Sequence, residues 1–290
     1  MAGGRSATTA AAPPLLTALP GTPAPGVPGM FLMTALPHWR AIDFISDLHL
    51  GADTPRTFET WAAYMRNTTA DAVLLLGDWV EAWVGDDSRF EGFEAQCAEV
   101  LTECARHRTV GFMVGNRDFL IGADLLDACG VIPLPDPTRV DAFGERLLLT
   151  HGDELCLSDT DYQRYRAQVR HPDFQRQFLE LPMAARRQVV RQVRQQSEMR
   201  KGGGNAPSDW ADVDPTAAVA WMAHADTPAM IHGHTHRPAT ETLAPGRVRH
   251  VLSDWDLDHA PHRAEVFRWT AEGLARLSPT DAAVPTASAA

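Results

Sequence analysis

Short apolar segments of strand length alternate with helical segments through the middle of the chain, and this alternation limits the fold more than any other feature. Residues 72–76 form a continuous apolar run, and residues 109–114 nearly so, as in strands buried on both faces. Further strands are predicted at 42–46, 228–232, 248–252 and 264–269, with a hairpin over 140–150. Helices are predicted at 58–67, 92–106 and 124–129. This order predicts an α/β layered domain over residues 39–278.

The two ends of the chain differ in composition from the middle. Residues 1–38 contain eight Ala, seven Pro and five Gly but only one charged side chain. Such a stretch buries too little apolar surface to offset the entropy lost on ordering, so we expect it to be disordered. A secretory signal peptide, or a start of translation at Met30 or Met33, are alternatives for this segment. Residues 279–290 are again rich in Ala, Pro and Thr and are expected to form a loose tail.

A basic helical segment interrupts the domain at about residues 157–212. Between residues 162 and 201 it contains ten basic and three acidic residues, a local charge of +7 in a chain whose net charge is −11. The negative total argues against general binding of nucleic acid, whereas the local basic cluster suits a nucleotide diphosphate or an anionic bilayer surface. Phe174, Phe178 and Leu181 recur at helical spacing, so the segment can cover an apolar pocket. An ordinary amphipathic helix with a solvated basic face is the alternative.

Polar side chains follow five of the predicted strands, each at the carboxyl end of its strand and often beside a glycine. They occur as Asp47-Leu48-His49, Gly77-Asp78, Gly115-Asn116, His151-Gly152 and Gly233-His234-Thr235-His236. Each motif alone is as well explained by a turn or a helix cap. Together they place two Asp, one Asn and four His at the edge of the sheet where ligands bind. This mixed set of nitrogen and oxygen ligands suits two first-row divalent metals that share a bridging carboxylate, as in enzymes that hydrolyse phosphate esters.

These motifs resemble those of the calcineurin-like metallophosphoesterases. The resemblance implies a four-layer αββα sandwich with a helical lid insertion. It implies that one metal binds Asp47, His49, Asp78 and His236, and that the second binds Asp78, Asn116, His151 and His234, with Asp78 as the bridge. Catalytic roles are implied for Asp78, Asn116, Arg117 and His151. Asp118 and Asp153 are expected to orient the metal-binding side chains, because such ligands usually need hydrogen-bonding partners.

Arg117 stands where many members of this superfamily carry a histidine that assists the leaving group. Arginine cannot act as a general acid, because its pKa lies above about 12, but it can bind a phosphate with two parallel hydrogen bonds. The leaving group is therefore expected to depart without protonation, as a phosphate does. This favours a pyrophosphate bond over a simple phosphomonoester as the substrate.

Longer stretches of sequence narrow the resemblance. Residues 45–50, 81–87, 115–120, 151–156 and 234–238 resemble the UDP-2,3-diacylglucosamine diphosphatases of lipid A biosynthesis in Gram-negative bacteria. The resemblance implies hydrolysis of UDP-2,3-diacylglucosamine to UMP and 2,3-diacylglucosamine 1-phosphate, by a dimetal-activated hydroxide that attacks the α-phosphorus, with two Mn²⁺ as cofactors. It implies that the substrate is bound by Asn116, Arg117, Asp159, Tyr162, Ser197, Lys201 and His234.

The same resemblance implies a cytoplasmic protein that binds a lipid-linked nucleotide at the surface of the inner membrane. The four cysteines form no CxxC pair and are typical of reduced thiols in a cytosolic protein. No nucleic acid and no protein partner is implied. Two alternatives stay open: a soluble nucleotide pyrophosphatase or phosphodiesterase of the same superfamily, and a scaffold that kept the fold without the chemistry.

Overall fold

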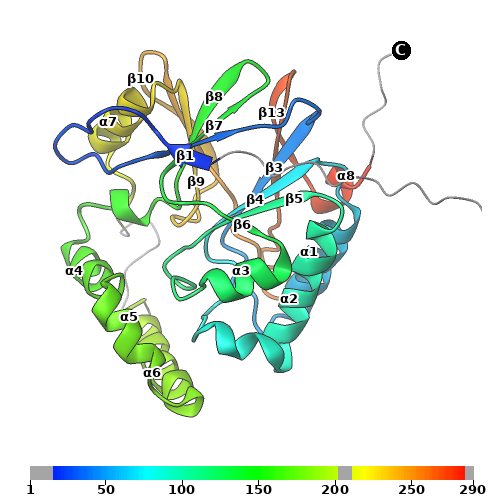
Figure 1. Ribbon diagram of the computed structural model, residues 1–290, viewed down its shortest axis with the longest axis vertical. Helices are drawn as coiled ribbons and strands as arrows, with labels where there is room; N and C mark the ends of the chain where they lie inside the picture. The colour runs from blue at the N-terminus through cyan, green and yellow to red at the C-terminus, as the bar shows by residue number, and fades with distance from the viewer. Residues whose placement is uncertain (1–15, 202–210, 285–290) are drawn as a thin grey trace, which may run out of the picture.

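The chain folds into two facing β-sheets with helices on both outer faces, as seen in a computed structural model that describes residues 16–201 and 211–284 (Figure 1). The first sheet contains, in spatial order, β13 (Gly273–Leu277), β12 (Val266–Thr270), β3 (Ala41–Ile45), β4 (Ala72–Leu76), β5 (Thr109–Met113) and β6 (Ile132–Pro133). The second contains β1 (Leu16–Ala18), β2 (Phe31–Thr34), β7 (Thr138–Ala142), β8 (Glu145–Leu149), β9 (Ala229–His232), β11 (Arg247–Val251) and β10 (Ala239–Ala244).

Three apolar clusters hold these layers together. Ile42, Leu74 and Ile231 belong to the cluster between the two sheets. The outer face of the first sheet packs on α1 (Pro55–Asn67), α2 (Gly92–Ala105) and α3 (Ala123–Cys129). The outer face of the second sheet packs on α7 (Pro215–Ala225) through Trp221 and Met222. The resulting order of helix, sheet, sheet and helix confirms the predicted αββα sandwich.

Three short elements lie between or after these strands and helices. They are η1 (Asp86–Phe90), η2 (Asp153–Leu155) and α8 (Pro279–Ala282). The strands predicted from continuous apolar runs agree closely with β4, which is buried throughout, and with β5, which is buried after its first residue. Strands β10 and β13 were not predicted, because both lie at sheet edges and expose much of their length, so their sequences lack the apolar run that marks a buried strand.

The expectation that residues 1–38 are disordered is wrong for residues 16–38. Strand β1 pairs antiparallel with β2, and β2 pairs parallel with β7, which places Met33 opposite Val140. Val27 and Met30 are buried in the cluster around Trp221. Composition failed here because the few apolar side chains of this segment extend an existing sheet and core instead of forming their own. Residues 1–15 lie outside the described part of the chain.

We expect Met33→Ala to lower the free energy of unfolding by about 2–5 kcal/mol, because truncating a buried methionine loses apolar contact and leaves a cavity. Met33 is fully buried and pairs with residues on both sides of β2. Thr34→Ala is the matched control, because Thr34 lies in the same strand but is exposed. Urea unfolding measures both. A loss below about 0.5 kcal/mol in Met33→Ala would contradict a stabilising role for the segment.

The expected loose tail at 279–290 is also partly wrong. Helix α8 packs beside α1, and Ala282 is fully buried. The Ala282 carbonyl oxygen accepts hydrogen bonds from Arg268 Nη2 at 2.8 Å and from the Thr69 N–H at 3.1 Å. These contacts fix the end of the chain to β12 and to the loop before β4. Residues 285–290 lie outside the described part.

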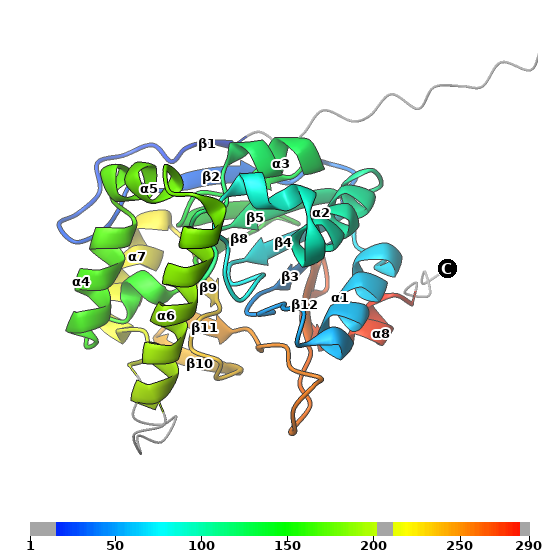
Figure 2. The same cartoon turned by 90° about the horizontal axis from the view of Figure 1, so that it is seen from below.

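Helices fill the described part of the segment expected to form a lid. They are α4 (Thr160–Val169), α5 (Pro172–Leu179) and α6 (Met183–Lys201), and together we call them the helical insertion. They lie on one side of the molecule, away from α1 (Figures 1 and 2). Residues 202–210 lie outside the described part, as do the side chains of Arg194 and residues 196–201. Among the described residues no helix is long and apolar enough to cross a bilayer.

Candidate metal centre

The polar motifs that follow the strands converge at one edge of the sandwich. Strands β3, β4 and β5 are parallel neighbours in one sheet, and β8 and β9 are parallel neighbours in the other, so their carboxyl ends lie together. Backbone hydrogen bonds also join the segments that follow β3 and β4, from the Asp47 N–H to Gly77 and from the His49 N–H to Asp78. The close approach requires Gly77, because a Cβ there would lie 2.6 Å from the Gly115 Cα and from His151 Nδ1.

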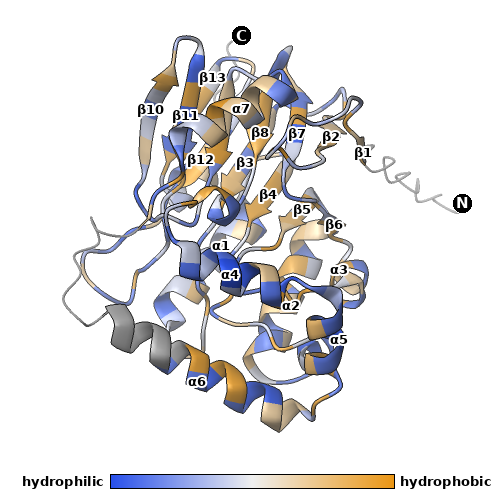
Figure 3. Cartoon of the chain, turned by 90° about the vertical axis from the view of Figure 1, so that its left-hand side faces the viewer, coloured by the Kyte–Doolittle hydropathy of each residue, from blue (hydrophilic) through white to orange (hydrophobic). Residues whose placement is uncertain are grey.

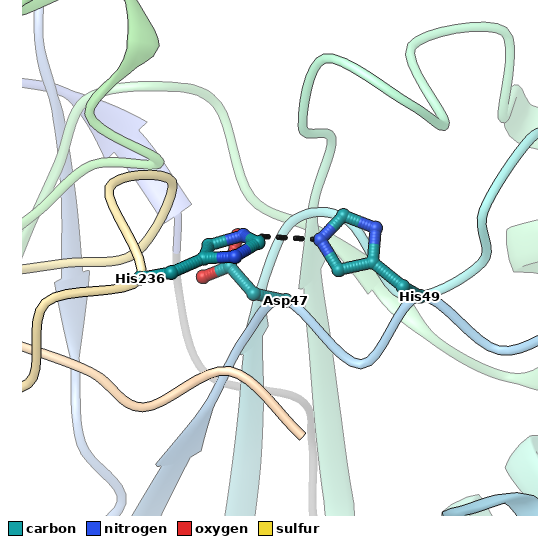
Figure 4. Close-up of side chains that lie close together, drawn as sticks. All are labelled: Asp47, His49 and His236. Carbon is teal, nitrogen blue, oxygen red and sulfur yellow. Dashed lines mark hydrogen bonds and ion pairs between the residues drawn. The ribbon is translucent and has the colours of Figure 1, made fainter. Parts of the chain in front are cut away.

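One group of ligands consists of Asp47, His49 and His236 (Figure 4). His49 Nε2 lies 3.1 Å from His236 Nε2, and His236 Nε2 lies 3.4 Å from Asp47 Oδ1. His49 Nδ1 lies 2.9 Å from Glu81 Oε2, and this close carboxylate favours a proton on Nδ1, so that Nε2 of a neutral ring carries a lone pair. That lone pair faces another imidazole nitrogen. A cation between the two rings satisfies this arrangement.

The second group gathers around His151. His151 Nδ1 lies 2.8 Å from the Leu76 carbonyl oxygen, which can only accept, so a neutral ring presents the lone pair of Nε2. This Nε2 lies 3.0 Å from Asn116 Oδ1 and 3.7 Å from Asp78 Oδ1, and His234 Nδ1 lies 2.7 Å from the same Asn116 oxygen. A lone pair that faces two oxygens again suits a cation between them.

Asp78 belongs with Asp47 and His151 to the second group, and its carboxylate also faces the first. Its Oδ1 faces His151, whereas its Oδ2 lies 3.8 Å from His49 Nε2. Because the two oxygens of one carboxylate face two different ligand groups, the side chain has the geometry of a bridge between two metals. The donor set of carboxylate, amide and imidazole groups therefore fits a centre with two divalent cations.

The backbone of this edge is strained at the ligands themselves. Positive φ angles of 46–65° occur at five of the seven predicted ligands: Asp47, His49, Asp78, His234 and His236. Residues other than glycine rarely adopt this conformation, and such strain concentrates at functional sites. The strained residues are those that follow β3, β4 and β9 at their carboxyl ends.

The electrostatics of the buried ligands also favour a cation. Burial alone would lower the pKa of His151, but Asp78, Asp153 and Asp47 raise it to about 9. Burial would raise the pKa of Asp47, yet the hydrogen bond to His236 and the neighbouring imidazoles lower it overall. Buried carboxylates thus attract positive charge at this edge, which a bound metal supplies.

The residues expected to orient the ligands act in different ways. Asp118 accepts the backbone N–H groups of Trp79 and Gly115, both at 2.7 Å, and so fixes the loops that carry Asp78 and Asn116. The carboxylate of Asp153 instead binds Tyr162 and Arg166, in the helical insertion.

Three carboxylates of the centre were not predicted from the sequence. Glu81 contacts His49, Asp136 accepts the His151 N–H, and Asp254 contacts His236. Asp254 follows β11 at its carboxyl end, so the rule that found the other motifs also applied to it. Asp136 and Glu81 follow no long predicted strand directly, and no local pattern marks them.

Residues 41–238 match the family model for calcineurin-like phosphoesterases. The chain belongs to the calcineurin-like phosphoesterase family. A UDP-2,3-diacylglucosamine hydrolase of Stenotrophomonas maltophilia (strain K279a) is 40% identical over 243 residues, which cover 80% of this chain and 98% of that protein. A UDP-2,3-diacylglucosamine hydrolase of Xanthomonas campestris pv. campestris (strain ATCC 33913) is 41% identical over 242 residues, covering 80% and 96%. The predicted family is confirmed, and the chain is a hydrolase of that family.

One solved structure that is similar to this chain is that of Yfce, a phosphoesterase from E. coli. It has a TM-score of 0.40 at 16% sequence identity, over 83% of this chain and 94% of that chain.

Only some of the residues predicted to bind substrate are seen to contact the centre of this phosphoesterase. Tyr162 reaches it from α4, with its ring centroid 5.7 Å from that of His234 and its hydroxyl donating to Asp153 at 2.6 Å. Asp159 caps α4 by accepting the Tyr162 N–H, which is sufficient to explain its presence structurally. The side chains of Ser197 and Lys201 lie outside the described part of the chain.

The backbone of Arg117 contacts the metal centre. Its backbone N–H donates to Asp78 Oδ1 at 2.8 Å, and its guanidinium Nη1 lies 3.4 Å from Glu81 Oε1. Nε is buried and has no hydrogen-bond partner among the described residues. The side chain therefore retains one buried donor that no described group satisfies.

Proposed function

We propose that this phosphoesterase hydrolyses the pyrophosphate bond of UDP-2,3-diacylglucosamine to UMP and 2,3-diacylglucosamine 1-phosphate. The observation that carries the proposal is the identity of about 40% to proteins named UDP-2,3-diacylglucosamine hydrolase, over nearly their whole length. All seven predicted metal ligands are present and lie at one edge of the sandwich, which argues against a scaffold without catalytic activity.

Different residues of the centre bind the metals and the phosphate groups. Two divalent metals, which we propose to be Mn²⁺, supply a water of lowered pKa and neutralise charge on the phosphate. Asp47, His49 and His236 hold one side of the centre, while Asn116, His151 and His234 hold the other, with Asp78 between them. Arg117 binds the diphosphate and stabilises the phosphate that leaves, so no general acid is needed at this position.

The helical insertion offers an apolar surface for the acyl chains. Eight large apolar side chains of the described residues remain exposed, and the six in this part of the chain are Leu157, Tyr165, Leu179, Leu181, Val189 and Val193. Figure 3 shows hydrophobic and hydrophilic stretches alternating along α6. These exposed apolar side chains would suit a lipid-linked substrate.

Two parts of the sequence interpretation of this segment change. Phe178 is buried in the core cluster around Trp79, and Phe174 stacks on it, so these rings hold the insertion to the body instead of facing a ligand. The basic side chains are largely paired: Arg164 with Asp161, Arg166 with Asp153 and Glu154, Arg176 with Asp173, Arg186 with Asp87, and Arg187 with Glu94. We still propose a position at the inner-membrane surface, now supported by the exposed apolar side chains.

The test is release of UMP from UDP-2,3-diacylglucosamine by purified protein, with and without Mn²⁺. We expect hydrolysis that disappears when a chelator removes the metal and returns when Mn²⁺ is added. Return with Zn²⁺ or Mg²⁺ but not Mn²⁺ would reject the proposed metal alone. Faster hydrolysis of a soluble nucleotide diphosphate, without dependence on acyl chains, would favour the alternative pyrophosphatase.

For Arg117→Lys we expect activity to fall sharply while the metal content stays unchanged. Lysine keeps the positive charge but cannot make two parallel hydrogen bonds to a phosphate, which we expect to cost about 10²–10³ in kcat. Arg117→His is not expected to restore activity, because the leaving phosphate needs no proton. Full activity in Arg117→His would indicate a phosphodiesterase with a poorer leaving group.

A further inference from the structure

Arg186 joins the helical insertion to the body of the protein at one buried point. It lies in the first turn of α6 and is 4% exposed. Its Nη1 donates to the Val84 carbonyl oxygen at 2.7 Å and to Asp87 Oδ1 at 2.8 Å, and its Nη2 donates to Asp87 Oδ2. Its Nε donates to the Leu181 carbonyl oxygen at 2.9 Å. One guanidinium therefore connects α6, the turn before it, and the loop that follows β4.

Position 85, in the loop that Arg186 contacts, has room only for a glycine. Gly85 has a φ of 125°, and a Cβ there would lie 2.4 Å from Arg186 Nη1 and 2.7 Å from Leu179 Cδ2. A side chain at this position would displace the guanidinium of Arg186 and the end of the Leu179 side chain, and the positive φ itself favours glycine. Leu179 is also one of the exposed apolar residues of the insertion, so the same contact sets the position of that surface.

The loop that Arg186 holds, residues 79–87, also contacts the metal centre. Glu81 Oε2 lies 2.9 Å from His49 Nδ1, and Glu81 Oε1 lies 3.4 Å from Arg117 Nη1. The Trp83 N–H donates to the Arg117 carbonyl oxygen at 3.3 Å. A single short loop thus contacts a metal-binding imidazole and Arg117 at one point and the insertion at another.

We infer that Arg186 is a positioning residue that sets the distance between the apolar surface of the insertion and the phosphate-cleaving centre. The inference rests on the proposed function, because acyl chains and diphosphate belong to one substrate and must be held at once. A buried guanidinium is favourable only when its donors are paired, and here they are paired with groups of fixed geometry on two segments. Lysine cannot reproduce these hydrogen bonds, because one ammonium group cannot donate to both carboxylate oxygens of Asp87 and also to the Val84 carbonyl oxygen.

The experiment compares Arg186→Met and Arg186→Lys in the full-length protein, with Arg187→Met as the matched control. Arg187 is the next residue of α6 and is much more exposed, with one ion pair to Glu94 at 3.5 Å. For Arg186→Met we expect KM for UDP-2,3-diacylglucosamine to rise about tenfold, or about 1.4 kcal/mol. We expect kcat and metal content to change far less, Arg186→Lys to be intermediate, and Arg187→Met to match the parent protein. An unchanged KM in a folded Arg186→Met protein would overturn the inference.

Hydrogen–deuterium exchange provides a second measurement that needs no substrate. We expect Arg186→Met to increase exchange in residues 172–193 while β3 and β4 keep their protection. An increase spread over the whole protein, with KM unchanged, would show a role in stability alone and overturn the inference. If the parent protein does not hydrolyse the acylated nucleotide, the proposed function fails. In that case the exchange result alone decides whether Arg186 positions the insertion.

Discussion

Asp78→Ala is expected to reduce turnover by several orders of magnitude, of the size that metal activation of water supplies. Its two carboxylate oxygens face His151 and His49, so in the proposed centre the substitution would remove a ligand from both metals at once. Loss of a ligand that serves one metal, as in His236→Ala, should cost less. UMP release and the metal content of the purified variants measure the two consequences separately.

Folding of the Asp78 variants should survive, because the ligands follow the strands and the three apolar clusters do not include them. Asp78 Oδ1 also accepts the Arg117 N–H, so Asp78→Asn, which keeps an oxygen for that hydrogen bond, separates the loop from the metal. We expect Asp78→Asn to fold like the parent protein and still lose most of its activity. Retention of a tenth of the parent turnover by Asp78→Ala would contradict a bridging role.

The metal centre could be predicted from sequence because one geometric rule governs it. Asp47, Asp78 and Asn116 are distant in sequence, yet each follows a strand of the same parallel set and reaches the same edge. Apolar runs locate these strands, so the ligands that follow them are located as well. Asp254 obeys the same rule, because it follows β11, a strand that the sequence also predicts.

Contacts between distant segments could not be predicted in this way. Arg186 and Asp87 are 99 residues apart, and neither lies at a position that a local pattern marks. The same holds for residues 16–34, whose composition is typical of disorder. Met33 is nevertheless buried because β7 and the core already provide a surface for it. Sequence composition describes a segment alone, whereas burial depends on what the segment packs against.

The largest expected effect on substrate choice is a preference for UDP-2,3-diacylglucosamine over UDP-glucosamine of about a hundredfold or more in kcat/KM. Each buried methylene contributes about 0.8 kcal/mol, so about four methylenes of one acyl chain supply roughly 3 kcal/mol, which corresponds to about a hundredfold. Binding energy far from the reacting phosphate can also align it, so turnover is expected to change along with KM. Rates on the two nucleotides under the same metal concentration give the preference directly.

Val189→Ser combined with Val193→Ser tests which surface provides that preference. Both side chains are exposed on α6, so the substitutions should leave folding intact, and all seven metal ligands lie outside the insertion. Removing residues 173–194 would be a poorer test, because Phe178 in that stretch belongs to the core.

Phe90→Ser is the matched control, because Phe90 is equally apolar and 70% exposed but lies outside the insertion. An equal loss of preference in the control would assign the effect to general surface hydrophobicity. Comparable rates of the parent protein on both nucleotides would contradict the lipid substrate and the role of the insertion together, since the metal centre alone cannot distinguish an acylated sugar from an unacylated one.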